Sequence, residues 1–434
     1  MGCQYYDPCH KGATSFTIAM PRLTFGRGCL NELGQRAANR GFKKVALVTD
    51  PLLEKGPIVE KAVTSLKAAG VESLVFSDIK IEPTDGCAET CASFLKSADV
   101  DAVVSVGGGS VIDTCKAAQV LHRQGGRLQR FFAPPVGQGE AVEEPLLPHI
   151  ACPTTSGTGS ECTSMSVIRV AEFNTKFVVA SPHLLPVEAI VDPECADSLP
   201  AMTVASTGYD LLCHALECFT ARAYTKYPSV EEVASRQLIQ GANPWSELIA
   251  SKALQIVDEY LDRGVNDRSD KEANDQLMWG ATLAGMAFGN TGTHLAHALS
   301  YGITHLMQDI TTPDYPVESP FVPHGISVMV LAPSVFNYTA EATPQRHLQA
   351  AHFLGCKTQN ASADDSGELL SKRLISLMKS THAPNGLSGV GFSDHHTEAL
   401  AESAFRQKRA IANAPRDSNL VDVTNVFSNA RNYW

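Results

Sequence analysis

Residues 102–118 read AVVSVGGGSVIDTCKAA, a short β-branched run followed by a glycine turn and the beginning of an apolar helical pattern. A strand that enters a helix through such a turn is half of a βαβ unit, which aligns strands in parallel. A pyrophosphate would be held by the helix N-terminus and by the backbone amides of Gly107, Gly108, Gly109 and Ser110. Because the turn lacks the GxGxxG spacing, a tight structural connection is the alternative interpretation.

The alternation of strands and helices continues on both sides of this stretch. Helices are predicted at 58–69 and 111–121, and buried strands at 44–49, 74–76, 102–106, 149–152 and 189–191. An added hairpin is predicted from residues 165–170 and 176–180. The pattern favours an α/β domain over residues 1–197, a Rossmann-like dinucleotide-binding domain whose parallel sheet carries helices on both faces.

Helical periodicity dominates from Leu199 onward. We expect helices at 207–220, 245–260, 275–288, 293–301, 326–336, 345–354 and 367–378. Segments 221–243 and 307–322 are predicted to be loops, and the second is rich in Pro, Asp and Thr. The second domain, residues 198–434, is therefore expected to be all-helical.

The composition limits the classes of function. The chain has 434 residues, and 46 acidic against 35 basic side chains give a net charge of −11. An acidic chain without a basic stripe is a poor nucleic-acid binder, and no apolar run approaches the ~18 residues of a membrane-spanning helix. The 12 cysteines form no CxxC pair, so we expect reduced, mostly buried thiols, with Cys87 and Cys91 on one face of a helix.

A second polar turn, PTTSGTGSE at 153–161, follows the strand predicted at 149–152. Its hydroxyls would form a lip for a ribose and phosphates, with a solvated loop as the alternative; the side chains concerned are Thr154, Thr155 and Thr158. Asp50 ends the strand at 44–49, where a carboxylate can accept from the adenosine ribose and repel a 2′-phosphate. The sequence therefore predicts NAD rather than NADP, unless Asp50 is only a turn residue before Pro51.

Asp210 and His214 are four residues apart in GYDLLCHALE, which places them on one face of a largely apolar helix. A buried carboxylate and imidazole need a partner, and a divalent metal is one. His324 in FVPHG can supply a further ligand. For the remaining position the spacing does not decide between the competing side chains of His294, His297 and His305.

Taken together these motifs resemble the iron-containing (group III) alcohol dehydrogenase family. The resemblance runs through FGRG at 25–28, VTD at 48–50, GGGSVIDTCK at 107–116, PTTSGTGSE at 153–161, VDP at 191–193, GYDLLCHALE at 208–217, AGMAFGNTGTHLAH at 284–297 and PHG at 323–325. It implies a dehydroquinate synthase-like architecture, in which an α/β dinucleotide-binding domain precedes an all-α metal-binding domain. It also implies hydride transfer between an alcohol and NAD.

The resemblance further implies roles for individual residues. The metal ligands would be Asp210, His214, His297 and His324, whereas His294 falls where most members have glycine. Asp113 and Lys176 would join the cofactor-binding residues, although an exposed ion pair of Asp113 with Lys116 is the alternative for that helix. Where many members have a second histidine near the substrate, this chain has Tyr301. The implied catalytic residues are therefore His297 and Tyr301.

HLAHALSY and the long stretch between His297 and His324 most closely resemble the hydroxyacid–oxoacid transhydrogenase subgroup. That resemblance implies oxidation of 4-hydroxybutyrate and reduction of 2-oxoglutarate through bound NAD, in the mitochondrial matrix and in a homodimer. Iron(II) is the metal that the family favours, and zinc is possible on affinity grounds. Arg222 is a candidate partner for the substrate carboxylate.

Three alternatives remain open. The first is an ordinary NAD-dependent alcohol or polyol dehydrogenase. The second is a lyase of the dehydroquinate synthase type, and the third is a non-enzymatic metal- or nucleotide-binding protein. The N-terminus has no apolar signal segment and no arginine before Arg22, so it is a weak transit peptide, and a cytoplasmic location is the alternative to the matrix.

Overall fold

The computed structural model describes residues 5, 11–133, 136–143, 145–232, 236–315 and 320–434. The chain divides into two compact units, one formed by Ala19–Ser198 and the other by Leu199–Trp434 together with Met1–Ile18. Of this N-terminal segment, Tyr5 and residues 11–18 are described and group with the helical unit, whereas the sequence-based range for the α/β domain began at residue 1.

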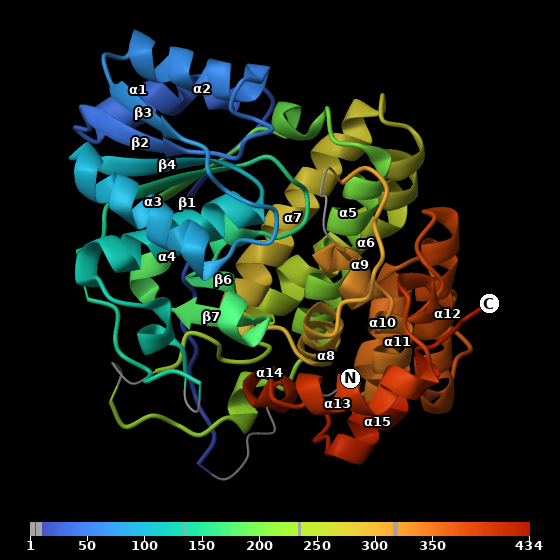
Figure 1. Ribbon diagram of the computed structural model, residues 1–434. Helices are drawn as coiled ribbons and strands as arrows, with labels where there is room; N and C mark the ends of the chain where they lie inside the picture. The colour runs from blue at the N-terminus through green and yellow to red at the C-terminus, as the bar shows by residue number, and fades with distance from the viewer. Residues whose placement is uncertain (1–4, 6–10, 134–135, 144, 233–235, 316–319) are drawn as a thin grey trace. The chain divides into compact units, whose positions relative to one another are not determined.

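The α/β unit is built on a six-stranded sheet in the order β1-β8-β5-β4-β2-β3, with every neighbouring pair parallel. Its strands are β1 (Arg22–Phe25), β2 (Lys44–Val48), β3 (Glu72–Phe76), β4 (Ala102–Gly107), β5 (His149–Pro153) and β8 (Glu188–Val191). The helices are α1 (Leu33–Asn39), α2 (Pro57–Ala68), α3 (Asp85–Ala98) and α4 (Gly109–Gln124). Figure 1 shows α1 and α2 on one face of the sheet and α3 and α4 on the other. The predicted parallel α/β domain is confirmed.

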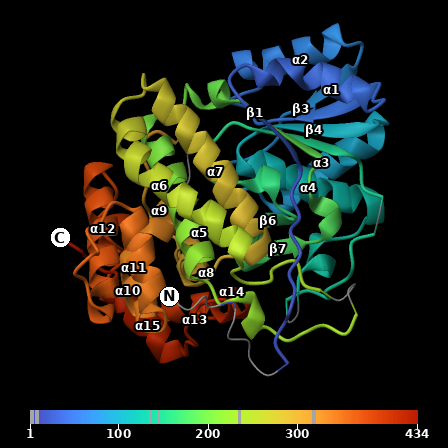
Figure 2. The same cartoon turned by 180° about the vertical axis from the view of Figure 1, so that it is seen from behind.

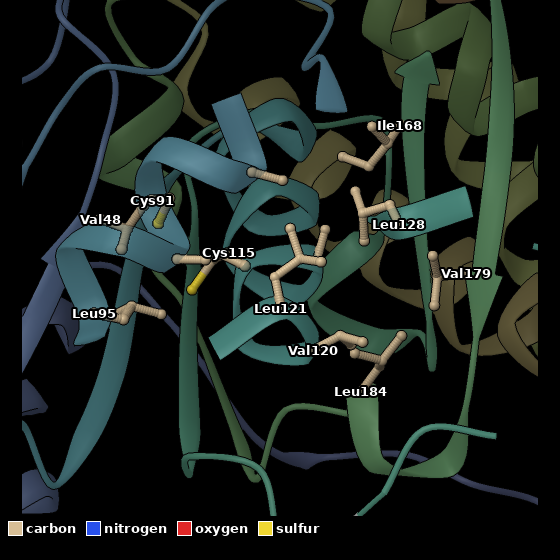
Figure 3. Close-up of a cluster of buried hydrophobic side chains, with 14 of the residues drawn as sticks. Val48, Cys91, Leu95, Cys115, Val120, Leu121, Leu128, Ile168, Val179 and Leu184 are labelled. Carbon is tan, nitrogen blue, oxygen red and sulfur yellow. The ribbon is translucent and has the colours of Figure 1, made fainter. Parts of the chain in front are cut away.

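Each central strand is buried on both faces because its side chains alternate between two cores. Val45 and Leu47 of β2 pack with α1 and α2. Ala46 and Val48 point the other way, into the core formed with α3 and α4. In Figure 3 this second core brings Val48 near Cys91 of α3. The continuous apolar strands that the sequence displays are the consequence of this two-sided burial.

The predicted hairpin is present as β6 (Met165–Val170) and β7 (Thr175–Ala180), an antiparallel pair separate from the main sheet. It packs against α4, and the same core includes Ile168 and Val179 (Figure 3). The hairpin therefore covers part of α4, the helix that begins at the glycine turn.

Strand β1 was not predicted, because its four residues are at most half-buried and show no apolar run. It forms the edge of the sheet beside β8. The turn that follows it is held by the Asp192 carboxylate, which accepts hydrogen bonds from the amides of Gly28 (2.9 Å) and Leu30 (3.0 Å). Two of the motifs quoted above, FGRG at 25–28 and VDP at 191–193, are thus linked by hydrogen bonds.

The second unit is helical in all its described elements longer than one turn, as predicted. Its helices are α5 (Ala201–Thr220), α6 (Pro244–Asn266), α7 (Lys271–Thr291), α8 (Leu295–His305), α9 (His324–Met329), α10 (Ala332–Ala340), α11 (Pro344–Phe353), α12 (Ser366–Ser380), α13 (Thr397–Ala404), α14 (Lys408–Ala412) and α15 (Leu420–Asn429). Helices α5, α6 and α7 pack side by side, as Figure 2 shows. Helix α5 is buried along most of its length, so its polar residues need partners inside the protein.

The prediction of one helix over 326–336 is wrong, because the chain forms α9 and then α10. Pro333 is the second residue of α10. It has no amide hydrogen to donate to the carbonyl of Met329, and its ring clashes with that carbonyl in a continuous helix. The first helix therefore ends at Met329.

The expectations for loops and thiols agree with the described residues. Apart from a short turn at Tyr224–Lys226, no helix or main-sheet strand occurs in the described parts of 221–243 and 307–322; residues 233–235 and 316–319 lie outside them. The cysteines in the described ranges are free, and all but Cys356 are buried. Cys87 and Cys91 share a buried face of α3. Among the described residues, no helix is long and apolar enough to cross a membrane.

Candidate metal centre and dinucleotide site

One face of α5 carries the polar residues of the candidate metal centre. Asp210, His214 and Glu217 follow one another at spacings of four and three, which keeps them in line along the helix. All three are buried, and Glu217 is 0% exposed. A largely apolar helix thus brings two carboxylates and an imidazole into the interior.

The predicted ligands converge on one oxygen of Asp210. Its Oδ1 lies 3.2 Å from Nε2 of His297 and 3.7 Å from Nε2 of both His214 and His324. Donors about 2.1 Å from a tetrahedral cation stand roughly 3.4 Å apart, so these separations fit a shared ion. The ligand atoms of Asp210, His297 and His324 all lie within 4.8 Å of one another. His214 is not in this mutually close set, and its Nε2 approaches the set at Oδ1 of Asp210.

The electrostatics of this cluster suit a cation. Burial alone would raise the pKa of Asp210, but the nearby His214, His324 and His297 hold it below its usual range, so the group is a carboxylate. Burial lowers the pKa of His297, yet Glu217 and Asp210 outweigh that effect and raise it to about 9. Two buried carboxylates therefore attract positive charge to this point, and a divalent metal would provide it.

His294 is separated from the cluster by its hydrogen bonds. It is the N-cap of α8, where its Nδ1 accepts from the amide of Leu295 at 2.7 Å. Its Nε2 lies 3.0 Å from Oγ1 of Thr220. Burial lowers the pKa of His294 to about 4, so the ring is neutral, and the 3.4 Å approach of its Nδ1 to Glu217 is not an ion pair. Both ring nitrogens of His294 therefore make hydrogen bonds at the N-terminal end of α8.

Glu217 is a polar residue of the site to which the sequence interpretation gave no role. Its Oε1 accepts from the amides of Ala296 (2.5 Å) and His297 (3.1 Å), and its Oε2 lies 2.5 Å from Nδ1 of His297. The signal that identifies it is its position three residues after His214, on the same face of α5. A buried carboxylate so placed orients an imidazole.

Tyr301 lies one turn after His297 on α8. Its ring is stacked beside that of His324, with centroids 6.3 Å apart and an interplanar angle of 27°. The side chain is half-buried. This position is compatible with contact to a substrate, and its catalytic role stays a prediction.

In the α/β unit, Asp50, the glycine turn and the polar turn at 153–161 follow the carboxyl ends of the neighbouring strands β2, β4 and β5. The Thr49 hydroxyl after β2 donates to the carbonyl of Val106 in β4 (2.8 Å), and the amide of Thr154 after β5 donates to the carbonyl of Gly107 (3.1 Å). The chain places β3 on one side of β2 and then crosses to the other side to form β4. The direction in which successive strands are added to the sheet therefore reverses between β2 and β4. Such a switch point is where open α/β sheets bind ligands.

The glycine turn leaves little room for side chains. A Cβ at Gly109 would lie 2.6 Å from Cγ2 of Thr158, and one at Gly108 would lie 3.1 Å from Cγ2 of Thr155. Helix α4 begins after Gly108, and no side chain caps it. Unshielded amides at a helix N-terminus fit a pyrophosphate, so the residues present suit a dinucleotide.

Asp50 forms a turn, as the alternative interpretation of this residue predicted. Its Oδ1 accepts from the amides of Leu52 (2.9 Å) and Leu53 (3.1 Å). Burial raises the pKa of Asp50, and these two hydrogen bonds oppose that effect. The turn uses Oδ1, and contact of Asp50 with a ribose stays a prediction.

The interpretation of Asp113 and Lys116 as an exposed ion pair is wrong, because both are buried. Lys116 Nζ donates to the carbonyls of Ser160 (2.6 Å), Thr163 (2.8 Å) and Met165 (2.8 Å). Oδ2 of Asp113 accepts from the amide of Val167 at 2.9 Å. These contacts attach α4 to the polar turn and to β6.

Two other predicted residues have partners within their own units. Lys176 of β7 forms an ion pair with Glu82 (2.8 Å), so its contact with a cofactor stays a prediction. The Arg222 guanidinium bonds to Asp417 (2.5 Å) and to the carbonyl of Ala414 (3.3 Å). A substrate carboxylate would have to compete with Asp417 for this arginine.

Known proteins resemble the chain along nearly its whole length. Residues 21–193 match the family model described as iron-containing alcohol dehydrogenase, and residues 204–431 match the C-terminal model of the Fe-containing alcohol dehydrogenase family. Two proteins named mitochondrial hydroxyacid-oxoacid transhydrogenase, from Mus musculus and Homo sapiens, are 37% and 36% identical over 415 residues, or 95% of this chain and 89% of theirs. A crystal structure of 1,3-propanediol oxidoreductase is 28% identical, with a TM-score of 0.84 over 96% of this chain and 100% of its own.

Proposed function

The chain belongs to the iron-containing alcohol dehydrogenase family of oxidoreductases, and from this membership we propose that it is a hydroxyacid–oxoacid transhydrogenase. It oxidises 4-hydroxybutyrate and reduces 2-oxoglutarate, with the hydride carried by NAD that stays bound. The observation that carries this proposal is the 37% identity, over 95% of the chain, to a transhydrogenase of that name.

The helical unit provides the residues for a divalent metal, iron(II) in this proposal. Asp210, His214, His297 and His324 would hold it, and the short separations of the three Nε2 atoms from Oδ1 of Asp210 support this assignment. When bound, the metal supplies Lewis-acid polarisation of a hydroxyl or carbonyl oxygen, and the nicotinamide supplies a hydride acceptor. Tyr301, stacked beside His324, shapes the substrate pocket and moves a proton to or from the reacting oxygen.

The α/β unit binds the dinucleotide in this proposal. The amides at the start of α4 hold the pyrophosphate, and the hydroxyls of Thr154, Thr155 and Thr158 contact the ribose and phosphates. Asp50 accepts from the adenosine ribose through the oxygen that its own turn does not use. Asp113 and Lys176 support this region through their bonds to Val167 and Glu82.

The test is an isotope-transfer assay on iron-loaded protein. 4-Hydroxybutyrate deuterated at C4 is mixed with 2-oxoglutarate without added NAD, and the 2-hydroxyglutarate formed is analysed by mass spectrometry. Deuterium at C2 of the product is the expected result, because bound NAD passes on the same hydride. Asp210→Ala protein, which lacks the central ligand, is the control for background exchange.

The same assay distinguishes the proposed transhydrogenase from the main alternative, an NAD-dependent dehydrogenase of primary alcohols or polyols. The 28% identity to a 1,3-propanediol oxidoreductase favours that alternative. It predicts no exchange without added NAD and release of free NADH when NAD and an alcohol are supplied. That outcome would contradict the transhydrogenase proposal while leaving the family intact.

We extend the proposal to location and assembly on the basis of the same relatives. Their names place them in mitochondria, and we propose the mitochondrial matrix for this chain and a homodimer as its assembly. Subcellular fractionation and light scattering test the two statements, and a cytoplasmic monomer would contradict both.

A further inference from the structure

Glu217 reaches from α5 to the first turn of α8, where it meets both the backbone and a side chain. Its Oε1 accepts from the amides of Ala296 and His297, the second and third residues of α8. Its Oε2 faces Nδ1 of His297 at 2.5 Å. The side chain is 0% exposed, so bulk solvent does not reach these contacts.

The two oxygens therefore perform different tasks. The amides at a helix N-terminus have no partner within the helix, and Oε1 serves two of them. An ionised carboxylate only accepts hydrogen bonds, so Oε2 requires a proton on Nδ1 of His297. The proton on Nδ1 leaves Nε2 as the nitrogen whose lone pair can bind a cation, and Nε2 is the atom that lies 3.2 Å from Oδ1 of Asp210.

We propose that Glu217 is a positioning residue that sets the tautomer and the orientation of His297 for metal binding. This inference rests on the proposed metal site and adds a residue that does not contact the ion. The alternative is that Glu217 only caps α8, in which case its loss lowers stability without a specific effect on the metal.

The variant Glu217→Gln separates the two tasks because an amide has one oxygen and one donor. With its oxygen toward Ala296 and His297, it turns its NH₂ toward Nδ1, and the ring proton must move to Nε2. In the opposite orientation the Gln oxygen accepts from Nδ1 of His297. Its NH₂ group then faces the amide hydrogens of Ala296 and His297, which are also donors. In the first orientation metal affinity falls, and in the second the end of α8 loosens.

The experiment measures the affinity of the full-length protein for Co(II) by competition with a chelator, together with the visible spectrum of the bound ion. We expect Glu217→Gln to weaken Co(II) binding by about 10–100-fold and to change the spectrum. Glu217→Asp, which keeps the charge, should restore part of the affinity. Hydrogen exchange at the amides of Ala296 and His297 reports the state of the helix end.

The matched control is His294→Ala, which removes the acceptor for Leu295 in the same helix turn but leaves the contact between Glu217 and His297. It should lower the melting temperature and keep the Co(II) affinity. Thr220→Val is a second, nearly isosteric control that removes the hydroxyl bonded to His294.

The outcomes are distinct. If the amides of Ala296 and His297 stay protected in Glu217→Gln and neither the Co(II) affinity nor the spectrum changes, Glu217 is only a cap and the inference is overturned; if those amides lose protection, an unchanged affinity and spectrum in Glu217→Ala overturn it. If the unaltered protein itself does not bind Co(II), Fe(II) or Zn(II) in the competition assay, the proposed metal site fails, whatever the variants do.

Discussion

Oγ1 of Thr220 lies 3.0 Å from Nε2 of His294, and this pair accounts for the histidine that spacing alone did not distinguish from His297. The Thr220 hydroxyl donates to the carbonyl of Leu216 at 2.7 Å, so it accepts from the ring. His294 then has a proton on Nε2 and a lone pair on Nδ1, which the amide of Leu295 uses. Neither nitrogen is left for a metal.

The first prediction follows from this division of roles. His297→Ala and His324→Ala each remove a donor next to Oδ1 of Asp210, so both proteins should be purified with little metal and little activity. His294→Ala should retain its metal. Inductively coupled plasma mass spectrometry gives the metal content; metal loss in the His294 variant alone would show that the ligand assignment is displaced by three residues.

The second prediction concerns the charge of Asp50. Asp50→Asn keeps an oxygen that can accept from the amides of Leu52 and Leu53, but removes the charge that would repel a 2′-phosphate. We expect the ratio of NADP to NAD affinity to rise by about 10-fold, roughly 1.4 kcal/mol, as measured by fluorescence titration. Asp50→Ala is the comparison that also loses the turn. An unchanged ratio in the Asn variant would leave Asp50 with its turn function only.

The third prediction concerns the buried Lys116. Lys116→Met leaves the carbonyls of Ser160, Thr163 and Met165 without their donor and removes the positive charge near Asp113 and Glu161. The free energy of unfolding should fall by on the order of 3 kcal/mol in urea titrations. The exposed Lys96→Met serves as the control and should change it little. Equal stability of the two variants would contradict a structural role for the buried ammonium group.

The fourth prediction is a pH dependence of stability caused by His347. Burial lowers its pKa from 6.5 to about 4, so the unfolded chain binds a proton in this interval that the folded chain does not. The stability contributed by the neutral ring is therefore fully present above pH 6.5 and declines as the pH falls toward 4. The melting temperature of His347→Gln should depend less steeply on pH between these limits. Parallel profiles for the two proteins would exclude this histidine as a source of the acid sensitivity.

The parts of the fold that were predictable are those with a local periodic signal. The strands around Val45 and Val103 are continuous apolar runs because both of their faces are buried, and helix α5 was recognisable from its apolar stripe. Strand β1 was missed because an edge strand needs no such run. The break at Pro333 was missed because the apolar pattern continues through it.

The candidate site was predictable only as far as side-chain chemistry and spacing reach. Asp210 and His214 share a helix, so their proximity follows from the helical repeat. The roles of Glu217 and His294 depend on how α8 packs against α5, which no local pattern expresses. Likewise, the sequence did not reveal that the amine of Lys116 lies among carbonyls of a segment more than forty residues away.

The close contact between the glycine turn and Thr158 restricts how these two positions can evolve. A side chain at position 109 would meet Cγ2 of Thr158 at 2.6 Å and also its Cβ at 2.9 Å, so alanine at position 158 would not clear the space. Unless the backbone shifts, one of the two positions must therefore be glycine. Substitutions at the two positions are then not independent: a side chain at position 109 is accommodated only once glycine has replaced Thr158, so the order of the two changes matters.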